Sequence, residues 1–290
     1  MAEREARVVR FRIPDRLPPD VLKTFRHLIE RTDSTGKEHA AALCVTRDGR
    51  LTVGKTCEGT ECAAYVEGPP GCSPGEIQVG LFHTHPPGTA PVWSMGDVLH
   101  KVASCYHNPN YVLNCLGSPD SKYIVCHVLK ERRKERLSDL YQSLETGTTP
   151  GDFMYTIYRV LPSMIYDEDG RLIPENSREH EKAIREISLA LFKCYLRGAT
   201  VAFNEAEIEL RKDDPSALRE YIDGYIVDTM YECARLACND ITAHFGREAN
   251  ILCRLAVDEW IEEHHPAIAE GVLRDVLASL KKEKAEALVR

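Results

Sequence analysis

The first 130 residues alternate between short apolar runs and helical stripes. After a Pro-Pro pair, apolar residues at helical spacing predict a helix that runs to about Glu30. A second helix is expected from Ser94 to about Cys105. Short apolar runs bounded by turn-forming residues predict strands over residues 8–13, 39–45, 51–53, 63–66, 77–83, 111–116 and 122–129. This order predicts an α+β fold, in which a mixed sheet is flanked by helices.

From about residue 130 the apolar positions follow a helical period. They predict helices over residues 131–144, 178–197, 216–244, 249–263 and 266–287. We therefore divide the chain into a mixed domain over residues 1–130 and an all-α C-terminal region over residues 131–290. The helical region shows no chemical motif. We expect it to mediate homo-oligomer formation or the binding of a partner protein.

Charge is distributed unevenly along the chain. The 290 residues include 37 basic and 45 acidic side chains, a net charge of −8. Residues 1–150 hold 19 basic and 18 acidic side chains, whereas residues 151–290 hold 18 and 27, a net charge of −9 for the second half. Binding of nucleic-acid phosphates needs clustered Lys and Arg, so this balance predicts that nucleic acid is not a partner.

The sequence contains no run of about 18 consecutive apolar residues, the minimum for a membrane-spanning helix. Its first residues are charged from the third position onward and lack the apolar stretch of a secretory signal. We therefore expect no membrane contact and a cytoplasmic location.

Eleven cysteines are present, a high and odd number. In a cytoplasmic protein most of them are expected to be reduced, small buried side chains. Cys115 and Cys126 lie in apolar runs and fit that interpretation. A Gly- and Pro-rich stretch holds three more without the C-x2-C pairing of structural zinc sites. For these three a disulfide and a second metal site both remain open: Cys57, Cys62 and Cys72.

The strongest chemical motif follows the strand expected at residues 77–83. His83 and His85 are two residues apart, so both imidazoles project from one side of the strand end, and Pro86 then stops the strand. Two neutral histidines can hold one metal ion, and Asp97 on the next helix offers a third, anionic ligand. Ser94 and Asp97 also form an S-x-x-D helix-starting box with Ser94 as the N-cap.

Glu38 before an apolar strand, then His83-Thr84-His85-Pro86, then Ser94-Met95-Gly96-Asp97 resembles the motif of the JAMM (MPN+) zinc metalloproteases. The resemblance covers about residues 5–130, although the loop before Ser94 is one residue longer than is usual in that family. It implies a JAMM/MPN fold, a sandwich similar to cytidine deaminases. It also implies that His83, His85 and Asp97 bind Zn²⁺, that Glu38 is the general base, and that Ser94 hydrogen-bonds the developing oxyanion.

Two residue assignments have alternatives. Glu30, Glu61 and Glu76 compete with Glu38 for the role of base, and Glu38 is favoured because it stands at the start of an apolar strand. Trp93, in an otherwise polar loop, has two interpretations. It either contacts the substrate or, as we favour, packs against the sheet below the loop.

The resemblance implies an isopeptidase or peptidase that cleaves ubiquitin or a ubiquitin-like modifier from a conjugate or precursor. Two other hypotheses remain. The chain could be a non-catalytic MPN scaffold that binds partners through its helical half. It could also be a DNA-repair-associated relative of JAMM proteins, which the acidic second half disfavours.

Overall fold

The computed structural model of the chain describes residues 11–59, 71–108, 110–129, 142, 146, 161–199 and 203–289. Its centre is a six-stranded sheet with the strand order β2-β1-β3-β4-β5-β6. The strands are β1 (His39–Val45), β2 (Leu51–Glu58), β3 (Ile77–Thr84), β4 (Leu113–Gly117), β5 (Ile124–Val128) and β6 (Ser163–Tyr166). The helices are α1 (Pro19–Thr35), α2 (Met95–His107), α5 (Arg178–Gly198), α6 (Glu205–Arg211), α7 (Pro215–Phe245) and α8 (Arg247–Val289).

The sheet is mixed because β3 and β4 run parallel, whereas the other neighbouring strands are antiparallel. Parallel neighbours cannot be joined by a tight hairpin and need a crossover, which α2 provides. The chain therefore leaves the sheet at the end of β3, forms α2 and returns to β4. The candidate site therefore forms where β3 ends, and this connection leads from there to the start of α2.

Helices cover both faces of the sheet. On one face α1 packs through Val21 and Phe25, and the Phe25 ring stacks on Phe82 of β3 with ring centroids 3.8 Å apart. On the other face α2 packs through Val98 and Val102 over an apolar cluster that includes Leu81 of β3. The mixed sheet flanked by helices and the largely helical C-terminal part are thus confirmed.

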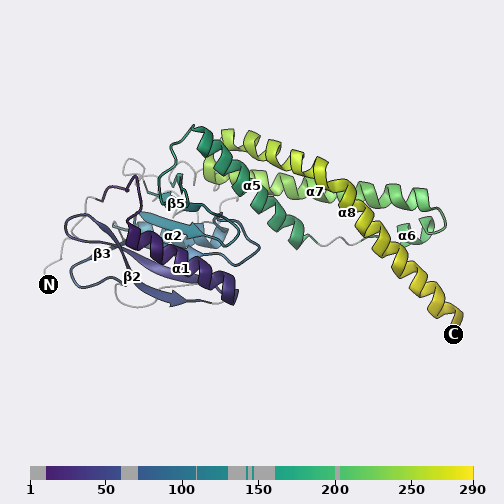
Figure 1. The fold of residues 1–290 in the computed structure, drawn as a ribbon, viewed down its shortest axis with the longest axis horizontal. Coiled ribbons are helices and arrows are strands. Elements are labelled where there is room, and N and C mark those ends of the chain that lie inside the picture. The colour runs from purple at the N-terminus through teal and green to yellow at the C-terminus, as the bar shows by residue number, and fades with distance from the viewer. Residues whose placement is uncertain are drawn as a thin grey trace.

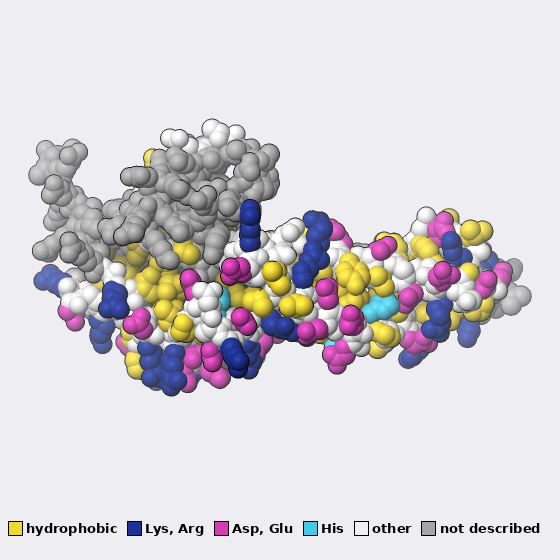
Figure 2. All heavy atoms as spheres, turned by 90° about the horizontal axis from the view of Figure 1, so that it is seen from above, with side chains coloured by type: hydrophobic (Ala, Val, Ile, Leu, Met, Phe, Trp, Pro, Cys, Tyr) yellow, Lys and Arg dark blue, Asp and Glu magenta, His cyan; other side chains and the backbone are white. Residues whose placement is uncertain are grey.

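The C-terminal helices form a long layer that runs from the sheet to the far end of the molecule (Figure 1). α7 runs toward the sheet and α8 runs away from it, and both pack on α5. Their core continues into the sheet through Val125 of β5 and Ile165 of β6. Acidic, basic and apolar side chains are interspersed along the face of this layer seen in Figure 2. None of the described helices has the length and apolar character needed to cross a bilayer.

Several predicted elements differ from the observed ones. The chain is not helical throughout after residue 130, because β6 adds to the sheet edge beside β5. This strand has four residues, too few for a period to be recognised in the sequence. Residues 11–13 form no strand, and β2 is longer than predicted. The strand expected at 63–66, most of the helix expected at 131–144 and residues 8–10 lie outside the described residues.

The two helices predicted around Pro266 are one continuous helix, α8. Proline inside a helix removes one backbone hydrogen bond and usually marks a boundary. Here the chain is buried on both sides of that position, with Ile261 before it and Ala269 and Leu273 after it in the helical core. Packing against α5 and α7 therefore outweighs the local preference to stop the helix.

Disulfides correct the expectation that the cysteines are mostly reduced. Cys115 and Cys126 are directly opposite each other on β4 and β5 and form a disulfide. Two further disulfides join Cys44 to Cys72 and Cys238 to Cys253. Cys72 is therefore not a metal ligand, and Cys62 lies outside the described residues. The sequence did not reveal these pairs because each depends on strand register or helix packing.

Candidate metal centre

The end of β3 presents two histidines to the side of the sheet covered by α2. His83 lies near the end of the paired part of β3, opposite Ala40 of β1 and Leu116 of β4. The backbone N–H of His85 donates to the Gly117 carbonyl at 2.9 Å and so extends the ladder by one residue. Both side chains are largely buried, with His83 5% exposed and His85 9% exposed. The predicted placement on one side of the strand end is confirmed.

Asp97 is fixed at the first turn of α2 by a complete capping box. The Asp97 N–H donates to Ser94 Oγ at 3.2 Å, and the Ser94 N–H donates to Asp97 Oδ2 at 2.8 Å. Ser94 Oγ also donates to the same carboxylate oxygen at 2.6 Å. The helix-start interpretation of Ser94 is therefore confirmed. The preceding loop over residues 86–93 leaves Asp97 beside both histidines.

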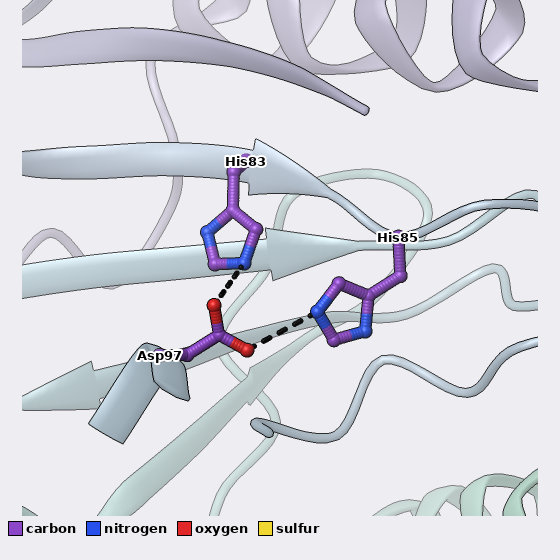
Figure 3. Close-up of side chains that lie close together, drawn as sticks. All are labelled: His83, His85 and Asp97. Carbon is purple, nitrogen blue, oxygen red and sulfur yellow. Dashed lines mark hydrogen bonds and ion pairs between the residues drawn. The ribbon is translucent and has the colours of Figure 1, made fainter. Parts of the chain in front are cut away.

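The three side chains converge on one point (Figure 3). Asp97 Oδ1 lies 3.1 Å from His83 Nε2, and Asp97 Oδ2 lies 3.3 Å from His85 Nε2. One ligand atom from each residue lies within 4.8 Å of the others, so the group could hold a metal ion. A tetrahedral zinc with ligands about 2.0 to 2.1 Å away separates ligand atoms by about 3.3 Å, close to both contacts.

Hydrogen bonding around the two rings also fits a cation. His85 Nδ1 lies 3.3 Å from the Ala90 carbonyl, and a ring nitrogen that faces a carbonyl is the N–H donor. The Nε2 of a neutral His85 therefore presents a lone pair to the Asp97 carboxylate, an arrangement that needs a cation or a proton. Within the described residues, Nδ1 of His83 is buried without a hydrogen-bond partner, while its Nε2 faces the Asp97 carboxylate. Buried polar atoms of this kind are costly unless another group satisfies them.

Electrostatics couple the three groups strongly. Burial alone would raise the pKa of Asp97, but hydrogen bonds from His83 and His85 hold this pKa well below its usual range. Burial alone would lower the pKa of His85, but the Asp97 carboxylate and then the Glu38 charge raise it above the ordinary value. The site thus favours positive charge between its carboxylate and its imidazoles.

Glu38 lies directly before β1 and is 8% exposed. Its carbonyl accepts a hydrogen bond from the Gly59 N–H at 2.8 Å, and its charge acts on His85. Its competitors are placed differently. Glu30 is exposed on α1, and Glu76 bonds to Thr52 Oγ1 at 3.0 Å and to a nearby backbone N–H. Glu61 lies outside the described residues. Among the described candidates, Glu38 is the one whose charge acts on the metal-site histidine.

Trp93 packs under the loop, as the favoured interpretation has it. The residue is 4% exposed, and its ring stacks on His127 of β5 with centroids 4.6 Å apart. The same ring makes a T-shaped contact with the His83 ring, with centroids 5.4 Å apart. The side chain is therefore a wall of the site and not a surface contact for substrate.

Sequence reasoning missed two buried histidines behind Trp93. His127 Nε2 lies 3.3 Å from Nδ1 of His244, and His244 Nε2 lies 3.2 Å from the Trp93 carbonyl. His127 occupies an apolar strand pattern and His244 the last turn of a long helix, so neither position carries a chemical motif. Burial lowers the pKa of His244 to about 4 and the pKa of His127 well below its ordinary value.

This pair predicts acid sensitivity of the fold. Lys101 and Asp97 of α2 are the charged groups that act on the pair; Lys101 lowers the pKa of His127, and Asp97 opposes the lowering. In the unfolded chain His244 takes up a proton near its ordinary pKa of 6.5, whereas the folded chain resists until about pH 4. Stability is therefore intact above pH 6.5. It is lost as the pH falls toward 4, by about 3 kcal/mol from His244 alone.

Denaturant unfolding of the wild type and of His244→Phe at pH 7.5 and pH 5 checks this prediction. We expect a smaller loss on acidification in the variant. The matched control His27→Asn changes an exposed histidine of α1 and should keep the wild-type pH dependence. An identical loss in His244→Phe and the wild type would assign the acid sensitivity to other groups.

Comparison of the chain with protein-family models and with curated protein sequences finds no match.

Proposed function

We propose that this chain is a zinc-dependent isopeptidase or peptidase of the JAMM type. The observation that carries the proposal is the convergence of His83, His85 and Asp97, with the buried Glu38 close enough for its charge to act on His85. Three protein ligands leave a fourth position open, which is the arrangement of catalytic and not structural zinc. The mixed sheet with α2 as its crossover is compatible with the resemblance of the sequence motif.

His83, His85 and Asp97 would hold the zinc ion. A bound zinc lowers the pKa of a coordinated water toward neutrality and polarises a carbonyl oxygen. Asp97 is suited to its part because the capping box fixes the carboxylate at the helix start. His85 is oriented by the Ala90 carbonyl, which selects the tautomer with its Nε2 lone pair toward the site.

Glu38 is the general base in this proposal. It accepts a proton from the attacking water and passes it to the amine that leaves when the amide bond breaks. Because Glu38 is buried, it can pass a proton from the water to the amine without losing that proton to bulk solvent. Ser94 is exposed at the start of α2, and its hydroxyl donates to the Asp97 carboxylate in the structure. In this proposal the hydroxyl turns from Asp97 to donate to the oxyanion of the amide carbonyl.

The substrate class rests on the resemblance alone. We propose that the amide bond cleaved follows the C-terminal tail of ubiquitin or a ubiquitin-like modifier. Such a tail is extended and can pair with an exposed backbone edge close to the site. The helical layer offers a separate surface for a partner protein or a second copy.

Cleavage of a ubiquitin-like fusion in the presence and absence of a metal chelator tests the proposal. We expect the wild type to cleave the fusion, to lose at least about 100-fold in rate with the chelator, and to recover with added zinc but not with magnesium. Magnesium is the control because it prefers oxygen ligands in octahedral geometry. Cleavage that persists in the chelator would exclude a metal mechanism. Stoichiometric zinc without any cleavage would favour the scaffold hypothesis.

A further inference from the structure

The loop over residues 86–93, here called the metal-site loop, touches both candidate histidine ligands. The Ala90 carbonyl accepts a hydrogen bond from His85 Nδ1, and the Trp93 ring makes a T-shaped contact with the His83 ring. The loop then leads directly into Ser94, whose backbone N–H bonds to Asp97. Its position therefore affects all three ligands at once.

The same loop residues are packed into the helical layer. Ala90 is 2% exposed, and with Val92 it belongs to the apolar core that includes Ile184 of α5 and Ile241 of α7. The loop is thus covered by residues far away in the sequence, and the mixed domain by itself would leave this apolar surface in water.

His244 at the end of α7 binds the last residue of the loop. It is 1% exposed, and its Nε2–H donates to the Trp93 carbonyl at 3.2 Å. With Nε2 as the donor, Nδ1 is the acceptor for the Nε2–H of His127, 3.3 Å away. The His127 ring in turn stacks under the Trp93 ring. The carbonyl and the ring of Trp93 are therefore both held, one from α7 and one from β5.

Arg197 near the end of α5 binds the first part of the loop. Its guanidinium donates to the Gly88 carbonyl, and the Gly88 N–H donates to the Asp120 carboxylate. Gly88 has φ +90°, a conformation that favours glycine, so its peptide groups point in fixed directions. Next to it, the Ser118 hydroxyl donates to the Thr89 carbonyl at 2.6 Å.

We propose that Arg197 and His244 are positioning residues of the metal centre, through which the helical layer sets the geometry of its ligands. The two side chains hold the metal-site loop near its two ends, and the loop orients His85 through Ala90 and His83 through Trp93. Groups that orient metal ligands typically change metal affinity about 10- to 100-fold when they are removed. The helical layer is then part of the site and not an appended module. This inference rests on the metal site of the proposed function.

The test uses the full chain with Arg197→Ala and His244→Phe, each with a matched control. Arg185→Ala removes a guanidinium of α5 that pairs with Glu259 instead of the loop. His265→Phe removes a histidine of α8 that pairs with Asp223. Three quantities are measured: the zinc dissociation constant by competition with a chelating dye, the unfolding midpoint of the zinc-free protein, and amide hydrogen exchange of the metal-site loop without zinc.

We expect Arg197→Ala and His244→Phe to weaken zinc binding about 10-fold, and both controls to leave it unchanged. Exchange of the loop amides should rise in the two variants and stay at the wild-type rate in the controls. Unchanged zinc affinity and loop exchange, with a lowered unfolding midpoint alone, would overturn the inference and reduce these contacts to packing. If the wild type binds no zinc, the proposed function fails, and unchanged loop exchange in the variants would separately reject the positioning role.

Discussion

Replacement of Glu38 by Gln is expected to lower the rate of cleavage by a factor of about 10² to 10⁴ without loss of bound zinc. Glutamine has nearly the same shape as glutamate but cannot accept a proton at neutral pH. The three proposed metal ligands remain in place because Glu38 is not one of them. The measurement is kcat on a ubiquitin-like fusion together with zinc content per chain.

Glu76→Gln is the matched control for this change. Glu76 also stands at the start of a strand, but its carboxylate bonds to Thr52 and to a backbone N–H and not to the site. Activity should remain at the wild-type level in this variant. Full activity in Glu38→Gln would place the base elsewhere, whereas a loss of zinc in the same variant would make Glu38 a ligand.

Replacement of Asp97 by Asn is expected to weaken zinc binding more than about 100-fold, beyond the effect of removing a group that only orients a ligand. The change removes the anionic member of the ligand set. Because Asp97 raises the pKa of His85, that pKa should fall in the variant. Zinc competition and NMR titration of the His85 ring measure the two effects.

Asp20→Asn controls for the helix position, since Asp20 lies in the first turn of α1 as Asp97 lies in the first turn of α2. Both changes remove a negative charge from a helix start, which typically costs up to about 1 kcal/mol of unfolding free energy. The control should lose stability on this scale and keep its zinc. If Asp97→Asn also keeps its zinc, then Asp97 only caps α2 and the metal proposal is wrong.

The parts of the site that sequence reasoning located are those set by local geometry. Two-residue alternation along β3 placed His83 and His85 on one side, and the S-x-x-D spacing placed Asp97 in the first turn of α2. Local geometry does not place Glu38, because it comes near His85 only through the register of β1 on β3. Its assignment rested on the resemblance to the family motif together with its place at the start of an apolar strand.

What the sequence missed depends on contacts between distant segments. His127 and His244 are 117 positions apart and are recognisable as a pair only once α7 lies against β5. The disulfide of Cys115 and Cys126 likewise needs the register of β4 and β5. At Pro266 the local rule was applied correctly and was outweighed by the burial of α8. Short-range signals therefore located the candidate ligands, whereas the residues that surround them are brought together by tertiary packing.

The parallel pairing of β3 and β4 permits changes in the length of the connection between them. The chain leaves the sheet after Thr84 and re-enters it at Leu113. The length of the segment between them is therefore not fixed by the register of β3 on β4. An insertion there lengthens the connection, while the paired ends of β3 and β4 stay in place. A change of length in this connection can therefore alter the surface in front of the candidate site without a shift in the pairing of β3 with β4.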